Sequence, residues 1–289
     1  MKQTYITEER LNEFIRSALK EDVGEGDHTT LAAIPPNATG KAQLLIKEDG
    51  VIAGLALAKK IFQHFDPSLN VTLLLKDGQQ VKNGDVGLTV SGKAASILTT
   101  ERLVLNCLQR MSGIATYTHK LTQYINHTPT KLLDTRKTTP NFRMMEKWAV
   151  YLGGGKNHRY ALYDMIMLKD NHIDFAGGLR PAILATQAYL KENRLTLKIE
   201  VETRTLQEVN EVLEIGGVDI IMLDNMDCPT MKKAVEIIGG RYETEASGGI
   251  TEATLREVAE CGVDYISVGA LTHQVKSLDI SLKAVKQVH

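Results

Sequence analysis

Hydrophobic positions near the start of the chain recur at the spacing of an α-helix. The apolar residues follow one another at short helical intervals, at Leu11, Phe14, Ile15, Ala18 and Leu19. Thr7 stands directly before the acidic pair Glu8 and Glu9, and a threonine in that place commonly accepts a hydrogen bond from the first turn of a helix. The pattern therefore predicts an amphipathic helix that begins after Thr7.

A different pattern runs from Gly40 to Gly92, where short apolar runs alternate with turn dipeptides. Residues 42–46 and 71–75 are apolar and strand-like. The turn signals between the runs are Asp49-Gly50, Asp77-Gly78, Asn83-Gly84 and Ser91-Gly92. This region is expected to form a small, mostly antiparallel sheet.

A third pattern follows a helical stretch at residues 97–125. Short apolar runs now lead into charged or small polar residues, at Asp134, Lys169, Glu200, Glu202, Asp224, Ser247 and Ser267. Helical segments such as 206–215 and 253–261 separate the later runs, which is typical of βα units in a parallel barrel or a doubly wound sheet. The whole pattern predicts an α+β N-terminal unit, a C-terminal α/β barrel, and a last helix from Ser277 to Val288.

Composition narrows the class of protein. The 289 residues are 43% hydrophobic, and 34 basic residues nearly balance 35 acidic ones, so no overall charge favours nucleic acid or an anionic membrane. The three cysteines, Cys107, Cys228 and Cys261, lack the close spacing of zinc sites or disulfide frameworks. No apolar run resembles a signal peptide or reaches the ~18 residues of a membrane span. A cytoplasmic enzyme or binding protein is expected.

Basic residues are concentrated between Lys131 and His172, where the sequence has eight Lys or Arg but only four Asp or Glu. Arg136-Lys137 follows an apolar run, and residues 153–159 form a glycine-rich loop that ends in His158-Arg159. Glycines allow close backbone approach, and arginine binds carboxylate or phosphate with two parallel hydrogen bonds. The segment indicates an anionic substrate; the alternative is a solvated charged face, although Lys169 directly ends an apolar run.

Acidic and small residues at other strand ends suggest a second set of contacts. Glu200 and Glu202 lie two apart on a predicted strand, so both point to the same face, and one or both are expected to face the barrel interior or its mouth. Glu202 with Asp224 suits Mg²⁺ or a ribose diol, the alternative being an ion pair with a nearby Lys or Arg. Ser247-Gly248-Gly249 and the segment from Ser267 through Gly269 to Ala270 fall where barrels commonly bind phosphate. No nucleophile motif is present, and His158 and His172 lack metal-ligand spacing.

Ordered motifs across essentially the whole chain resemble the quinolinate phosphoribosyltransferase family. They are the segments 21–27 (EDVGEGD), 101–106 (ERLVLN), 112–116 (SGIAT), 134–140 (DTRKTTP), 153–159 (GGGKNHR), 168–172 (LKDNH), 200–202 (EVE), 223–225 (LDN), 245–250 (EASGGI) and 279–283 (DISLK). The resemblance implies an N-terminal α/β sandwich domain, residues 1–112 joined by the tail 272–289, and a C-terminal open α/β barrel, residues 113–271. It also implies a homodimer whose subunits share active sites.

The resemblance further implies an activity, namely the Mg²⁺-dependent reaction of quinolinate with phosphoribosyl pyrophosphate to nicotinate mononucleotide, pyrophosphate and carbon dioxide. Quinolinate would contact Arg102 of a second subunit. In its own subunit it would contact the cationic segment, through Thr135, Arg136, Lys137, His158, Arg159 and Lys169. Ribose and metal would lie near Glu202 and Asp224, and the 5′-phosphate on Ser247, Gly248, Gly249, Ser267, Gly269 and Ala270.

Four of these residues are expected to take part in the chemistry. Glu202 and Asp224 would offset positive charge that develops on the ribose, and Lys137 and Lys169 would assist the departing pyrophosphate. Two alternatives stay open: a related phosphoribosyltransferase that acts on another base, including molybdenum-associated paralogues, and a non-catalytic phosphosugar-binding protein. The dense cationic segment favours a dicarboxylate, and the carboxylates together with Lys169 favour an enzyme.

Overall fold

A computed structural model describes residues 4–285, which divide into two compact units. The first unit comprises residues 1–119, 138–154 and 270–289, and the second comprises residues 120–137 and 155–269. Across the described residues, no helix combines the length and the apolar character that a membrane crossing needs. The domain limits expected from the sequence, 1–112 and 113–271, stay predictions.

The first unit opens with the predicted amphipathic helix. α1 spans Glu8–Val23, and the Thr7 side chain accepts a hydrogen bond from the Arg10 N–H, which satisfies one of the free donors of the first turn. Leu11 and Ile15 are buried on one face of α1. The expected N-cap and the expected buried face are thus confirmed. A short helix, α2 (His28–Ala33), follows and is capped by Asp27.

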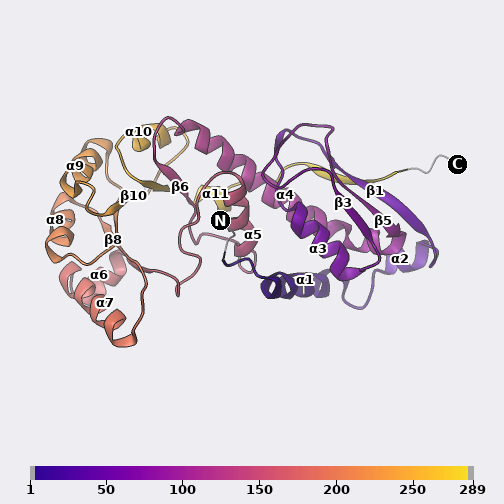
Figure 1. The fold of residues 1–289 in the computed structure, drawn as a ribbon, viewed down its shortest axis with the longest axis horizontal. Coiled ribbons are helices and arrows are strands. Elements are labelled where there is room, and N and C mark those ends of the chain that lie inside the picture. Colours follow the sequence, from indigo (N-terminus) through magenta and orange to yellow (C-terminus); the bar gives the residue numbers. More distant parts are fainter. Residues whose placement is uncertain (1–3, 286–289) are drawn as a thin grey trace. The chain divides into compact units, whose positions relative to one another are not determined.

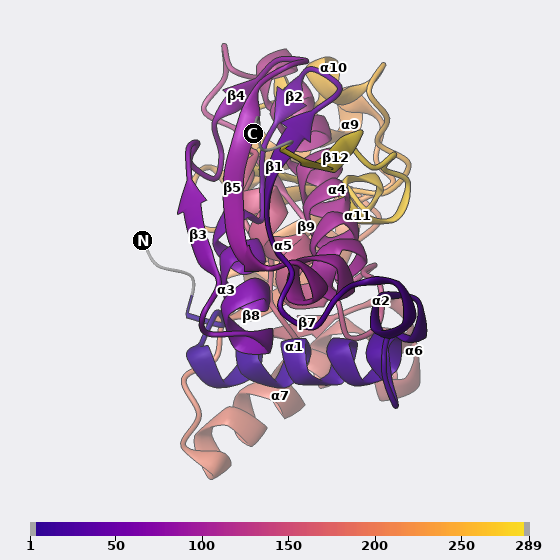
Figure 2. The ribbon, with the colours of Figure 1, turned by 90° about the vertical axis from the view of Figure 1, so that its right-hand side faces the viewer.

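The core of the first unit is a four-stranded antiparallel sheet in the order β12-β1-β5-β3. Its strands are β1 (Thr39–Ile46), β3 (Asn70–Leu73), β5 (Val86–Lys93) and β12 (Ile280–Ala284). Figure 2 shows β1, β5 and β3 side by side with α3 (Leu55–Phe65) behind them. A two-stranded ribbon of β2 (Gly50–Val51) and β4 (Gln80–Val81) completes the antiparallel region. The small sheet expected from residues 40–92 is confirmed.

The expected last helix from Ser277 to Val288 is wrong over the described residues. Ile280–Ala284 forms strand β12, which pairs antiparallel with β1, and Leu282 lies opposite Leu44. Ile280 and Leu282 are buried while Ser281 between them is not, so the alternation follows the period of a strand. Residues 286–289, where the expected helix would have ended, lie outside the described part of the chain.

Three more helices belong mainly to the first unit: α4 (Ala94–Tyr124), α5 (Arg143–Leu152) and α11 (Ala270–His273). A buried ion pair joins them, because Arg110 of α4 donates to Glu146 of α5 at 2.9 Å and also to backbone carbonyls of Thr272 and Val275. The Glu146 side chain is 0% exposed. Both of its oxygens also accept hydrogen bonds from Thr139, so this buried charge is fully satisfied.

The second unit is built on a six-stranded parallel sheet in the order β6-β11-β10-β9-β8-β7. Its strands are β6 (Lys131–Leu133), β7 (Ile166–Leu168), β8 (Ile199–Thr203), β9 (Ile220–Asp224), β10 (Glu243–Ser247) and β11 (Tyr265–Ser267). Its helices are α6 (Asp170–Ala176), α7 (Leu179–Asn193), α8 (Leu206–Ile215), α9 (Cys228–Ile238) and α10 (Leu255–Ala259).

Strand order distinguishes the two arrangements that the sequence left open. From β7 to β11 each strand pairs with its successor in the chain, and the order never reverses, whereas a doubly wound sheet reverses at a switch point. In Figure 1, α7, α8 and α9 lie on the outer side of this sheet. The unit is therefore wound in one direction like a barrel, with β6 and β7 as its two outer strands among the described residues.

Candidate active site

The carboxyl ends of the parallel strands bring the predicted polar residues to one edge of the sheet. The register pairs Leu168 with Val201, Thr203 with Leu223, Asp224 with Ser247, and Ser267 with Leu133. The side chains that end or follow these strands are Asp134, Lys169, Glu202, Asp224, Ser247 and Ser267. Active sites of barrel proteins lie at this edge, because rigid strands there present residues from several separate segments.

Glu202 and Asp224 lie on neighbouring strands of this edge, where Glu202 is opposite Met222, two residues before Asp224. Glu202 is 7% exposed, and burial, followed by the negative charges of Asp224 and Asp170, raises its pKa. Lys169 acts in the opposite direction. Two carboxylates and a lysine therefore interact at one place, a composition that suits a cation or a ligand rich in hydroxyl groups.

The glycines after β10 form a tight turn against Asn225. Gly248 and Gly249 have positive φ values of 89° and 60°, a region that glycine adopts without strain. A Cβ atom on Gly248 would lie 2.4 Å from the Asn225 Oδ1, so a larger residue there would have to displace the Asn225 side chain. Asn225, itself at φ 53°, donates its backbone N–H to Ser247 and its side-chain amide to Asp224. It thus links the strand-end carboxylate to the glycine turn.

A buried aspartate holds the glycine-rich loop of residues 153–159. Asp134 is 0% exposed and accepts hydrogen bonds from the His158 backbone N–H at 2.9 Å and from the Asn157 side chain at 2.6 Å. Lys156 forms a parallel bridge to Leu133, the last residue of β6. The loop is therefore anchored as an added segment beside β6, and His158 and Arg159 follow from a fixed backbone.

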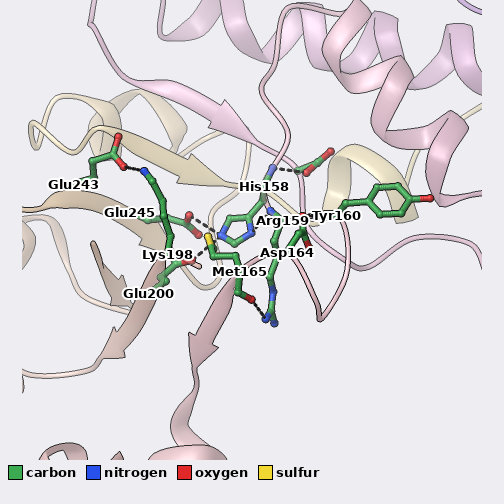
Figure 3. Close-up of polar contacts among 10 residues, drawn as sticks. His158, Arg159, Tyr160, Asp164, Met165, Lys198, Glu200, Glu243 and Glu245 are labelled. Carbon is green, nitrogen blue, oxygen red and sulfur yellow. Dashed lines mark hydrogen bonds and ion pairs between the residues drawn. The ribbon is translucent and has the colours of Figure 1, made fainter. Parts of the chain in front are cut away.

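The His158 side chain lies between two buried carboxylates that come from different strands (Figure 3). Its Nε2 is 2.8 Å from Glu200 and 3.3 Å from Glu245, and the three side chains are 6%, 0% and 0% exposed. Burial lowers the pKa of His158, but the hydrogen bonds and charges of the two glutamates outweigh it and raise this pKa to about 9. Burial and the charge of Glu245 raise the pKa of Glu200 to about 7.

Arg159 extends from the same loop toward another cationic side chain. Its Nη1 donates to the Met165 carbonyl at 3.1 Å, also drawn in Figure 3. Burial and the positive charge of Arg136 lower the pKa of Arg159, while Glu200 and Asp164 act against this. Two guanidinium groups thus interact with each other, and Glu200 interacts with one of them, an arrangement suited to a ligand with more than one carboxylate.

Comparison with known proteins agrees with this geometry. A model described as "Quinolinate phosphoribosyl transferase, N-terminal domain" matches residues 27–112, and its C-terminal counterpart matches residues 114–283. The chain belongs to the quinolinate phosphoribosyltransferase family. The family resemblance seen in the sequence motifs is thereby confirmed.

Relatives from plants and bacteria are similar over nearly the whole chain. The chain is 49% identical to a quinolinate phosphoribosyltransferase (decarboxylating) of Nicotiana glauca over 288 residues, covering 94% of this chain and 82% of the relative. Identity and both coverages are the same for a nicotinate-nucleotide pyrophosphorylase (carboxylating) of Arabidopsis thaliana. A crystal structure of NadC from Streptococcus pyogenes is 40% identical and covers 98% of this chain and 100% of its own, with a TM-score of 0.91.

The residues that the family resemblance assigned to the active site are distributed over both units. Arg136, Lys137, His158, Arg159, Lys169, Glu202, Asp224, Ser247 and Ser267 lie in the second unit. Lys137 and Lys169 are exposed, Ser267 is 8% exposed, and the Thr135 hydroxyl accepts from the Lys137 N–H. Arg102 is exposed on α4 of the first unit, and Ala270 opens α11, also of that unit. Their roles toward ligands stay predictions.

Sequence reasoning gave no role to three residues that shape this site. Asn225 and Glu245 were noticed only as members of motifs and Asp134 only as a strand-end residue in a motif, yet they link two strand ends, flank His158 and hold the glycine loop. The signal for Glu245 was available, since Glu243 and Glu245 lie two apart on a strand, as Glu200 and Glu202 do. His172, by contrast, accepts the Lys169 N–H in a helix cap.

Proposed function

We propose that the protein transfers the phosphoribosyl group of phosphoribosyl pyrophosphate to quinolinate with loss of carbon dioxide, a step of NAD biosynthesis. The products are nicotinate mononucleotide, pyrophosphate and carbon dioxide. The observation that carries the proposal is that a pair of interacting guanidinium groups and a strand-end pair of carboxylates both belong to the second unit, in a chain of the quinolinate phosphoribosyltransferase family.

Quinolinate carries two carboxylates, and the cationic segment is suited to both. Arg136 and Arg159 interact with each other and offer fork-shaped donors for bidentate hydrogen bonds. Lys137 and Lys169 add mobile point charges, His158 adds a ring that two glutamates polarise, and Thr135 lies beside Lys137. Arg102 of a second subunit would complete the set, so the proposal includes a homodimer with shared active sites.

The phosphoribosyl donor would lie along the other strand ends. Glu202 and Asp224 would accept hydrogen bonds from the ribose hydroxyls. The turn of Ser247, Gly248 and Gly249 has positive-φ glycines, and left-handed residues occur in the turns whose successive backbone N–H groups bind anions. Ser267, Gly269 and Ala270 would form the second side of the phosphate site.

The acidic residues at this edge also fit Mg²⁺, which binds proteins through one or two carboxylates together with substrate phosphates. Burial, followed by the negative charges of Asp224 and Asp170, raises the pKa of Glu202, and a divalent cation would relieve the repulsion among these carboxylates. Bound there, Mg²⁺ would neutralise charge on the pyrophosphate. Glu202 and Asp224 would hold it, directly or through water.

The residues of the chain support a substitution at the anomeric carbon. The quinolinate ring nitrogen forms a bond to C1 of the ribose as the bond from C1 to the pyrophosphate oxygen breaks, and the electron pair leaves with pyrophosphate. Glu202 and Asp224 offset the positive charge on the ribose, and Lys137 and Lys169 stabilise the leaving group. The 2-carboxylate then departs as carbon dioxide, its electrons stay on C2 beside the cationic nitrogen, and a solvent proton adds there.

Two further proposals concern the setting of the enzyme. We place it in the cytoplasm, which the free thiols of Cys107, Cys228 and Cys261 support. Subcellular fractionation tests this placement. Sedimentation of the purified protein tests the homodimer.

One assay tests the activity. Purified protein is mixed with phosphoribosyl pyrophosphate, Mg²⁺ and either quinolinate or nicotinate, and nicotinate mononucleotide and carbon dioxide are followed. We expect product and stoichiometric carbon dioxide from quinolinate. Product from nicotinate alone, or from neither acid, would contradict the proposal. Addition of a chelator should stop the reaction, and excess Mg²⁺ should restore it.

A further inference from the structure

We propose that Glu200 and Glu245 are positioning residues for quinolinate binding, which hold His158 and Arg159 in place before the ligand arrives. The inference rests on the proposed function and adds two residues to it. It starts from the cluster in Figure 3, where β8 and β10 each contribute one buried carboxylate to the same histidine ring.

The two carboxylates are not arranged for stability. Among the described residues, the Glu200 Oε1 and the Glu245 Oε1 are buried without a hydrogen-bond partner, and the Glu245 Oε2 has only a long contact, 3.3 Å, with the His158 Nε2. Leaving such groups unsatisfied costs free energy, and the cost is larger when the group is charged. Replacing buried ionic groups by well-packed neutral ones is often neutral or stabilising. The incomplete hydrogen bonding of Glu200 and Glu245 therefore indicates that these carboxylates have a role other than stabilising the fold.

The hydrogen bonds of the His158 ring fix which nitrogen carries a proton. The Arg159 backbone N–H donates to Nδ1 at 2.7 Å, while Nε2 faces Glu200 at 2.8 Å. An acceptor at Nδ1 places the proton of the neutral ring on Nε2, and the imidazolium ion carries one there as well. In both states Nε2 donates toward the carboxylates, which fixes the rotation of the ring.

The same tautomer argues against a metal ion in this cluster. His158, Glu200 and Glu245 each offer a ligand atom, and these atoms lie within 4.8 Å of one another. A histidine ligand must present a lone pair, but Nε2 uses its position for a proton. The three groups are therefore better explained as a hydrogen-bonded support for the ring.

Arg159 directly follows His158 in the chain and interacts with the same cluster. Arg159 lies near Arg136, and the like charges repel each other. The charge of Glu200 attracts Arg159, and in the neutral ring the His158 Nδ1 accepts the Arg159 backbone N–H. The charge of Glu200 thus offsets the repulsion between Arg159 and Arg136 before a dianion joins them. A site ordered in advance loses less entropy when its ligand binds.

Glu245→Gln is the central test, and Glu243→Gln is its matched control. Glutamine keeps the size of the side chain but removes its charge. Glu243 lies on the same strand two residues earlier, and it pairs instead with Lys198 and Tyr265 at the other end of β10. Calorimetric titration with quinolinate and, separately, with phosphoribosyl pyrophosphate gives both affinities, and thermal unfolding gives stability.

We expect Glu245→Gln to weaken quinolinate binding about tenfold, a loss of the size that follows removal of a group that orients a binding residue. The affinity for phosphoribosyl pyrophosphate and the Tm should stay at or above the wild-type values, and Glu243→Gln should leave all three unchanged. Glu200→Gln should behave like Glu245→Gln, with Glu245→Asp between it and the wild type.

Two results would overturn the inference. Charge acting through space predicts the opposite sign, because removing a negative charge strengthens binding of a dianion; tighter or unchanged quinolinate binding would therefore contradict positioning. A parallel loss of both affinities with a lowered Tm would show a purely structural role. Wild-type protein that binds no quinolinate would contradict the proposed function itself, before any variant is compared.

Discussion

Buried glutamates occur in both units, but their surroundings differ. Glu146 in the first unit accepts hydrogen bonds at both oxygens and pairs with Arg110. Glu200 and Glu245 in the second unit share one histidine; among the described residues their two Oε1 atoms have no hydrogen-bond partner, and the Glu245 Oε2 lies 3.3 Å from the His158 Nε2. The comparison teaches that a satisfied buried charge joins helices, whereas an under-satisfied one marks a place prepared for a ligand.

Removing Glu146 should have the largest effect on stability. Glu146→Ala leaves Arg110 without its anion and Thr139 without its acceptor, and we expect the free energy of unfolding to fall by about 4 kcal/mol. Urea unfolding measures this. Glu13→Ala, at an exposed position of α1, is the control and should change little. If Glu146→Ala were as stable as the wild type, the distinction between the two clusters would fail.

Glu202 sharpens the comparison, because it lies on β8 only two residues after Glu200 but at the strand end. We expect Glu202→Gln to lower kcat about 100-fold, since it removes charge that stabilises the transition state. Stability should not fall, because burial and Asp224 already raise the pKa of this carboxyl group. Steady-state kinetics and thermal unfolding test both parts. A raised KM with an unchanged kcat would assign Glu202 to binding alone.

A substitution of Asn225 tests whether an uncharged side chain also positions binding residues at the carboxyl ends of the strands. Asn225→Gly keeps the positive φ but loses the amide that contacts Asp224 and packs against Gly248. We expect the KM for phosphoribosyl pyrophosphate to rise about fivefold, in keeping with loss of about 1 kcal/mol, and the KM for quinolinate to stay constant. Arg194→Gly removes another non-glycine residue at positive φ and should change neither KM.

The smallest expected effect is in the pH dependence of stability. Because Glu200 and Glu245 raise the pKa of His158 from 6.5 to about 9, the folded protein holds the proton more tightly than the unfolded chain does. This stabilisation is complete below pH 6.5 and is lost as the pH rises through 9. The Arg159 N–H points at the His158 Nδ1 and so opposes protonation of that nitrogen. We therefore expect the free energy of unfolding to fall by only about 1 kcal/mol over this pH interval.

Unfolding measured at a series of pH values tests this sign. Glu245→Gln should flatten the slope above pH 6.5, since it removes one of the charges that favour the protonated ring. The same measurement on Glu243→Gln should reproduce the wild-type slope. A stability that rises over this interval would mean that His158 is neutral in the folded protein, and the inner cluster would then resemble the satisfied cluster around Glu146.

Much of the fold followed from local pattern. The spacing of Leu11 and Ile15 was enough to predict α1, and the apolar runs before Lys169 and Asp224 were enough to place strand ends. Side-chain period depends only on backbone geometry, which acts over a few residues. The predicted strand ends also indicated the site, because residues that end parallel strands lie at one edge of a sheet. The family motifs contain the same residues.

Other features could not be read from neighbours in the chain. Residues 280–284 form a strand because β1 offers a free edge to pair with, and isolated sequence does not contain that partner. Likewise, the alternation on β10 indicates which side Glu245 faces but not which strand or loop lies opposite.

The sequence alone determined the helical and strand periods, the clustering of cations between Lys131 and His172, and the family. Only the tertiary structure decided that His158, Glu200 and Glu245, from a loop and two separate strands, meet within hydrogen-bonding distance. The reason is physical: periodicity fixes the direction of each side chain along its own segment, whereas the contact between segments depends on strand order, register and the anchoring of the loop by Asp134.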